Sequence, residues 1–275
     1  MKRINYLLLT ATMLSFAACS NDEGTNNDNN LVEARITASA SRAIDDKWEA
    51  DAIAVTVASS PVSSMKDMYK NVKYTTTSTG TTAEFVAEQN KSIYFQDADE
   101  TVTFTAYGPY NDQNSEGDIL FSTENQNTAE TRKAVDFIYA SGVRASKSSP
   151  TVNFMFKHIM SRLTLKVTAG NGISASDITS GQYFLNGIEL NGKFNANTGA
   201  AQAITSSATQ NQQQYSLNDK VQITPNEADK RTFTVICFPF DYSNKPLEFI
   251  ATVNGQNYKL NLSLNLEGGK NYTYN

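Results

Sequence analysis

The sequence predicts an all-β chain of antiparallel strands, most simply arranged as β-sandwiches. Apolar and polar residues alternate with a period of two in several segments, as expected for strands with one face in a core and the other in water. Spacers rich in Gly, Pro, Asn and Ser separate these segments and provide turns. No long stretch has the periodicity of an amphipathic helix, so an architecture of sheets is expected.

The first predicted strand covers residues 31–41. Its expected inward face consists of Val32, Ala34, Ile36, Ala38 and Ala40. In chain order, the other clear strands are IAVTV (53–57), TVTFTAY (101–107), LTLKVT (163–168), LEFIATV (247–253) and YKLNLSLNL (258–266). In the last of these, the five apolar residues from Tyr258 to Leu266 are expected on one buried face.

The N-terminus has the pattern of a lipoprotein signal peptide. Lys2 and Arg3 precede a mostly apolar stretch, residues 4–18, that is too short for a permanent membrane span. Cys19 follows small residues, so we expect cleavage before it and attachment of a diacylglycerol to its thiol. Phe16 departs from the more usual Leu, and an ordinary secretory signal that happens to contain a Cys is the alternative. Lipidation predicts that the chain is attached to a membrane.

The rest of the chain divides into a tether and two expected domains. Residues 19–30 lack apolar side chains that could enter a core, so they are expected to form a flexible tether. Asp22 and Glu23 resemble the surface-export signal of Bacteroidetes lipoproteins. The small polar residues of 140–150 predict a boundary between an N-terminal β-sandwich, 31–147, and a C-terminal one, 148–275.

Composition argues against several classes of function. The net charge of −5 argues against nucleic acid as a partner, since phosphate binding needs clustered Lys and Arg. After Cys19 the only cysteine is Cys237, expected as a buried strand thiol, and His158 is the only histidine. One His and one free Cys do not make an ordinary zinc site, although acidic residues could hold calcium. We therefore predict no cofactor and no catalytic, cofactor-binding or metal-ligating residues.

Few residues are candidates for chemistry or sugar binding. The doublets Asp45–Asp46 and Asp99–Glu100 could serve glycoside hydrolysis, but neighbours on a strand point to opposite faces, so solvated turn charges are the simpler interpretation. Trp48, Tyr107 and Tyr110 could stack on sugars, or could anchor a core and cover the end of a sandwich. The sequence does not predict an enzyme.

Seven segments in the same order resemble the Bacteroidetes fimbrillins of the Mfa-like type, from about residue 19 to 275. They are SRAIDDKWEADAIAV, FTAYGPY, DFIYA, FKHIMSRLTLKV, GIELNGKFNANTG, VICFPF and LEGGKNYTYN. The resemblance implies two transthyretin-like β-sandwich domains and a pilus subunit that is secreted as a lipoprotein to the outer-membrane, cell-surface location of the fimbria. Cell adhesion is the expected purpose of such a fimbria, and host or bacterial surface ligands are candidate partners. The resemblance also implies that a trypsin-like protease removes the first strand, and that other pilin subunits fill the groove by strand addition.

The sequence offers two cleavage sites for such a maturation. Cutting after Arg42 would release the whole first strand together with the lipid, whereas cutting after Arg35 would release half of it. We therefore prefer Arg42, with Arg35 as the alternative; a third possibility is that both are strand residues and nothing is cut. Burial of the strand's Val and Ile contributes about 1.5–3 kcal/mol each, so loss of the strand is severe but survivable.

The C-terminal segment GGKNYTYN ends where similar fimbrillins commonly continue into a donor strand. A subunit that accepts a strand and donates none is expected at the end of a filament, as tip or anchor; a truncated sequence is the alternative. The main alternative function is a monomeric surface lipoprotein that binds glycans through exposed aromatic residues such as Trp48 or Tyr110.

Overall fold

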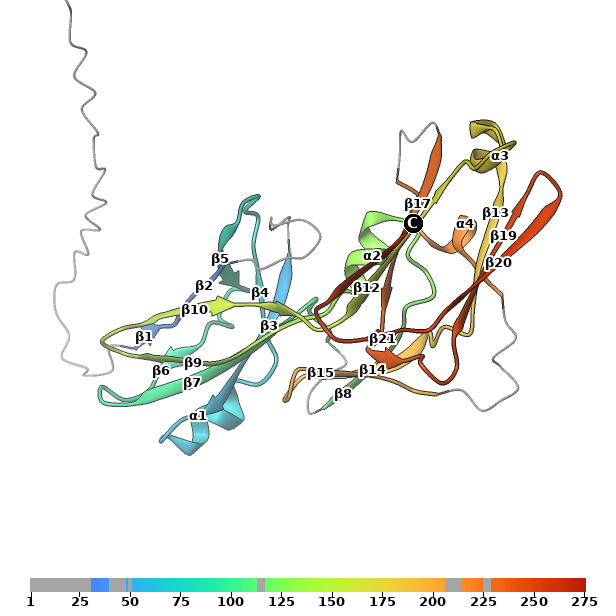
Figure 1. Ribbon diagram of the computed structural model, residues 1–275. Coiled ribbons are helices and arrows are strands. Elements are labelled where there is room, and N and C mark those ends of the chain that lie inside the picture. The colour runs from blue at the N-terminus through green and yellow to red at the C-terminus, as the bar shows by residue number, and fades with distance from the viewer. Residues whose placement is uncertain (1–30, 40–47, 49–50, 113–116, 206–213, 225–228) are drawn as a thin grey trace, which may run out of the picture. The chain divides into compact units, whose positions relative to one another are not determined.

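Strands dominate the computed structural model, which describes residues 31–39, 48, 51–112, 117–205, 214–224 and 229–275 (Figure 1). The predicted all-β class is confirmed. The helices are short: α1 (Ser63–Met68), α2 (Ala129–Val135), α3 (Ala175–Ser180) and α4 (Leu217–Lys220). Capping boxes begin α2 at Thr128 and α3 at Ser174, which explains why such short helices form without a long periodic pattern.

The first half of the chain builds an eight-stranded sheet in the order β10-β2-β5-β4-β3-β7-β9-β11. Its strands are β2 (Arg35–Ser39), β3 (Ala52–Ser59), β4 (Val72–Thr75), β5 (Thr82–Ala87), β7 (Thr101–Gly108), β9 (Ile138–Ser146), β10 (Thr151–Met155) and β11 (Lys157–His158). A separate pair, β1 (Val32–Glu33) and β6 (Tyr94–Phe95), lies beside it. The two ends of the sheet share one core, because a single apolar cluster draws on β2, β5 and β10 as well as β3, β7 and β9.

The second half of the chain forms smaller sheets around a second core. One has the order β17-β12-β22, with β12 (Ser161–Thr168), β17 (Lys230–Cys237) and β22 (Asn271–Tyr274). Another has the order β16-β13-β19-β20, with β13 (Gln182–Asn186), β16 (Tyr215–Ser216), β19 (Leu247–Val253) and β20 (Gln256–Leu262). A short pair joins β18 (Phe240–Asp241) to β21 (Asn265–Leu266).

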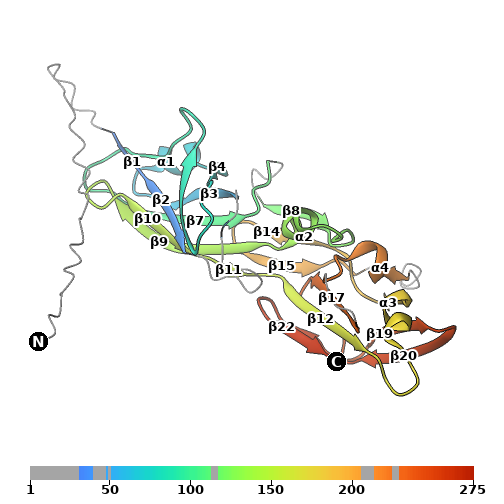
Figure 2. The ribbon, with the colours of Figure 1, turned by 90° about the horizontal axis from the view of Figure 1, so that it is seen from above.

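A third cluster of buried side chains links the two halves. The sheet β15-β14-β8 combines β8 (Asp118–Ser122) with β14 (Asn191–Asn195) and β15 (Ala200–Ala203), so it pairs strands from both halves (Figure 2). Phe137 stacks on Phe194 at a ring-centroid distance of 4.5 Å, and Tyr107 packs on Phe194 at 5.5 Å. Tyr107 enters this cluster and is buried, so it is a core residue rather than a surface platform for sugars.

Several sequence-based expectations needed correction. The segment 258–266 is not one strand: β20 ends at Leu262, and the Leu264 carbonyl accepts a hydrogen bond from the Tyr242 amide at 2.8 Å. Tyr258 and Leu260 are each 48% exposed, because both faces of β20 are exposed to solvent before Leu262. The expected boundary segment 140–150 contains part of β9, and β10 beyond it joins the same sheet. The division into domains at residues 147 and 148 stays a prediction.

Candidate functional site

The first predicted strand lies inside a sheet rather than at its edge. β2 pairs with β10 in parallel, from Arg35 opposite Thr151 to Ser39 opposite Met155. On its other side β2 pairs with β5 in antiparallel orientation. Removal of β2 would therefore expose the backbone hydrogen-bonding groups of two strands at once, which an extended peptide could satisfy.

The inward face formed by β2 and by Ala34 just before it is small. Ala34, Ile36 and Ala38 are at most 2% exposed, which confirms the predicted face at these positions. Val32 is half-buried, and Ala40 lies outside the described residues. The neighbouring strands supply larger inward side chains, Phe154 from β10 and Phe85 from β5. The space that β2 occupies is therefore narrow and lined by aromatic rings.

Arg35 lies within this ladder. Its side chain is exposed, while its amide donates a hydrogen bond to the Pro150 carbonyl at 2.9 Å. On the same outward face, the Thr37 hydroxyl donates to the Asn153 side chain at 3.2 Å. A protease binds its substrate as an extended strand, so cleavage at Arg35 would require β2 to leave the sheet first. Arg42 and Cys19 lie outside the described residues.

Trp48 is buried in the core of the first half. It is 0% exposed, and its ring meets Phe85 edge to face at 5.1 Å and Phe156 at 5.7 Å. Its amide donates to the Gly80 carbonyl at 2.8 Å. This burial removes Trp48 as a surface platform for sugars and identifies it as a core anchor of the chain that follows β2.

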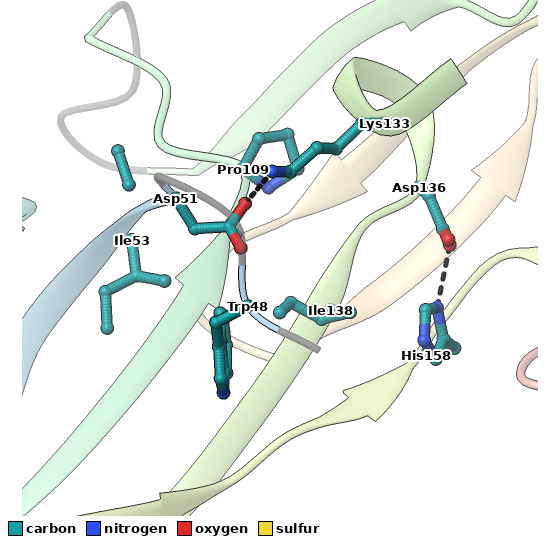
Figure 3. A pocket seen from close by; sticks show the side chains of 10 residues that line it. Trp48, Asp51, Ile53, Pro109, Lys133, Asp136, Ile138 and His158 are labelled. Atoms are coloured by element: carbon teal, nitrogen blue, oxygen red, sulfur yellow. Dashed lines mark hydrogen bonds and ion pairs between the residues drawn. The ribbon is translucent and has the colours of Figure 1, made fainter. Parts of the chain in front are cut away.

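An ion pair and a hydrogen bond between side chains lie close to Trp48 (Figure 3). Asp51, only 6% exposed, pairs with Lys133 of α2. The His158 Nδ1 atom lies 2.8 Å from the Asp136 carboxylate. The Asp51 carbonyl also accepts a hydrogen bond from the Thr76 amide at 2.9 Å. The chain that follows residues 40–47 is thus held in the fold by a buried indole, an ion pair and main-chain hydrogen bonds.

Cys237 and Glu100, two further residues singled out from the sequence, are buried. Cys237 is fully buried, and desolvation raises the pKa of its thiol to about 12, so it carries no reactive thiolate at neutral pH. Glu100, expected as a solvated turn charge, is 2% exposed: it accepts hydrogen bonds from the Gln96 amide at 2.5 Å and the Ser60 hydroxyl at 3.3 Å. The chain at Gln96 and Ser60 thus covers the Glu100 carboxylate. The alternation of apolar and polar residues does not predict such contacts. Asp45 and Asp46 lie outside the described residues.

Sequence reasoning missed the Asp51–Lys133 pair and the partners of β2. The two residues of the pair are 82 positions apart, and neither has a distinctive neighbour in the sequence. The Thr128 cap was the available signal for the start of α2, but it does not indicate that Lys133 pairs with Asp51. Within the described residues, no helix is long and apolar enough to cross a membrane, and no three acidic, His or Cys side chains gather as metal ligands.

Comparison with known proteins identifies the family. Residues 41–275 match the family described as fimbrillin-like, so the chain belongs to the fimbrillin-like family, and the resemblance predicted from the sequence is confirmed. A relative from Bacteroides uniformis, "Putative fimbrium subunit Fim1C", is 28% identical over 171 residues, which are 61% of this chain and 55% of that protein. The chain therefore spans about half the length of this relative.

Solved structures support the same fold. A "putative cell adhesion protein" from Bacteroides ovatus has a TM-score of 0.71 at 26% identity, with coverage of 89% of this chain and 91% of that one. A protein with the same description from Bacteroides uniformis has a TM-score of 0.67 at 22% identity, with coverage of 90% and 93%. The second comparison establishes similarity of fold alone.

Proposed function

We propose that the protein is a structural subunit of a cell-surface fimbria, exported as a lipoprotein through Cys19 and assembled by strand exchange at the position of β2. Membership of the fimbrillin-like family and similarity to a fimbrium subunit support the fimbrial role. The position of β2 between β10 and β5 is the observation that carries the assembly mechanism. A two-domain, transthyretin-like organisation and a tip or anchor position belong to the same proposal.

The small inward face of β2 suits a strand that has to leave. Burial of Ile36 contributes about 1.5–3 kcal/mol, and Ala34 and Ala38 contribute less. The backbone ladder to two neighbours gives the remaining stability, and an incoming strand would restore that ladder. In the exchange, main-chain hydrogen bonds of the incoming strand replace those of β2. The difference in side-chain packing between the two strands therefore decides which of them is favoured.

Cleavage after Arg42 fits this mechanism better than cleavage after Arg35. A cut at Arg35 would leave Ile36 and Ala38 in place and keep the groove closed. A cut at Arg42 would detach all of β2, while Trp48 and Asp51 hold the chain that follows. The new N-terminal segment would thus stay attached to the fold beside the opened groove.

The experiment is limited trypsin digestion of the purified chain, with Arg42→Gln and Arg35→Gln as matched variants. We expect a single early cut that leaves Ala43 as the new N-terminus, followed by polymers on size exclusion. Arg42→Gln should remain uncut and monomeric, and Arg35→Gln should behave as the wild type. A wild-type chain that stays intact and monomeric under these conditions would contradict assembly by cleavage.

The monomeric glycan-binding alternative loses two of its three candidate platforms, because Trp48 and Tyr107 are buried. Tyr110 is half-buried and lines a surface cavity, so the structure leaves this residue available for ligand binding.

A further inference from the structure

A surface cavity of about 570 Å³ lies in the first half of the fold, and its lining does not include a residue of β2. It is enclosed by the chain from the end of α1 into β4, the connection 88–92 between β5 and β6, and the aromatic side chains of Tyr94 and Tyr110. Its volume is within the range of sites for small organic ligands, roughly 300–1,000 Å³.

The backbone of this cavity is held in an unusual conformation. Asn71 and Asn90, which both line it, have positive φ angles of 52° and 64°. Two hydrogen bonds fix the Asn71 side chain: its amide donates to the Asn111 carbonyl at 2.9 Å, and its oxygen accepts from the Tyr107 hydroxyl at 2.7 Å. Asn adopts this left-handed conformation more readily than most residues other than glycine, so Asn71 and Asn90 provide turns in the wall of the cavity.

Charge is unevenly distributed around the cavity. Lys70, Lys73 and Lys91 line it together with one carboxylate, that of Glu88. Lys70 is paired with Asp67 at 3.7 Å. Within the part of the chain that the structure describes, neither Lys73 nor Lys91 has a carboxylate at ion-pair distance. Lys73 is half-buried and places its ammonium 5.3 Å from the centre of the Tyr110 ring. Two cations are thus available to an anion that enters the cavity.

The tyrosines add flat apolar surface and a hydroxyl donor. Burial, with the charges of Asp112 and Glu88, raises the pKa of the Tyr110 phenol, so this group stays protonated at neutral pH. Flat rings, amide and hydroxyl groups, and two ammonium groups match a molecule with C–H faces, many hydroxyls and a carboxylate. We propose that this cavity binds an acidic saccharide, with its carboxylate at Lys73 and Lys91 and a sugar ring against Tyr110.

The test is isothermal titration calorimetry on the purified full chain. The probes are 3′-sialyllactose, lactose as the matched neutral sugar, and tri-galacturonate as a second carboxylate sugar. We expect at least one of the acidic sugars to bind about tenfold more tightly than lactose, and the affinity to fall with added salt. Equal affinity for acidic and neutral sugars, or no measurable binding of either acidic sugar, would overturn the proposal.

Variants separate the site from the rest of the surface. Lys91→Met changes an exposed side chain, so it should fold normally and weaken binding of the acidic sugar about fivefold or more, without changing the affinity for lactose. Tyr110→Ala should remove binding, whereas Tyr110→Phe should keep most of it.

Lys245→Met, at an exposed position on another part of the chain, is the charge-matched control and should have no effect. Binding that is unchanged in both Lys91→Met and Tyr110→Ala would also overturn the proposal. The titration uses the uncut monomer, so its outcome is independent of fimbrial assembly.

Discussion

The rings of Trp48 and Phe85 meet edge to face, with an interplanar angle of 87°. Phe85 belongs to β5 and lies opposite Ile36 of β2, so the indole packs against a strand that borders β2. The segment that follows residues 40–47 and one wall of the proposed groove are therefore joined by a direct contact. Because Phe85 contacts both β2 and Trp48, the packing of Trp48 should help to keep β5 in place after β2 is removed.

Trp48→Ala should lower the free energy of unfolding by about 3–5 kcal/mol, because it removes a fully buried ring and leaves a cavity. Trp48→Phe keeps part of the aromatic packing and should lose less. Urea denaturation followed by circular dichroism measures both values. A loss below about 1 kcal/mol in Trp48→Ala would contradict the anchoring role.

Larger side chains on the inward face of β2 should speed the release of the strand. Ala38 is 1% exposed and lies opposite Ala83, so Ala38→Leu overpacks the core and costs about 1–3 kcal/mol. After trypsin cleavage, we expect the cut segment to dissociate faster from Ala38→Leu than from the wild type, as measured by native mass spectrometry. Thr37→Ser, on the outward face, keeps the hydroxyl that donates to Asn153 and is the control. Equal release from Ala38→Leu and Thr37→Ser would count against strand release from this groove.

Alternation along the chain predicted the inward faces well and the neighbours of each strand poorly. A period of two determines which side chains share a face, as at Ile36 or Phe104, because pleating is a local property. It does not say whether the second face is also covered, as at Tyr107, or whether the first face is covered at all, as at Leu260. Those outcomes depend on contacts between segments far apart in the chain.

The sequence likewise predicts some parts of the candidate site and not others. Its strand and its small inward face were predicted from residues 31–41, and Trp48 was recognised as a possible anchor. The parallel pairing of β2 with β10 joins residues 116 positions apart, such as Arg35 and Thr151, and has no local signal. The surface cavity at Tyr110 likewise combines segments whose separate sequences are ordinary turns and strands.

The ion pair of Asp51 with Lys133 should stabilise the fold. Lys133→Met leaves a buried carboxylate without this partner, and we expect the free energy of unfolding to fall by about 1–3 kcal/mol; Lys133 is 38% exposed, which limits the effect. In a double-mutant cycle, Asp51→Asn should reduce the cost of Lys133→Met. Additive losses would show that the two side chains are not coupled. Lys245→Met should leave stability unchanged.

Stability should decrease at alkaline pH because of Cys237. The pKa of its thiol is raised in the folded state from an ordinary value of 9.0 to about 12, by desolvation. Above about pH 9 the unfolded chain releases this proton while the folded chain retains it, so the free energy of unfolding falls as pH rises. Tyr74, whose pKa is raised to about 12 for the same reason, adds to the decrease above about pH 10. Urea titrations at pH 8, 9 and 10 should therefore give declining stability, with a smaller decline in Cys237→Ala. Identical slopes for the two proteins would exclude this thiol as the cause.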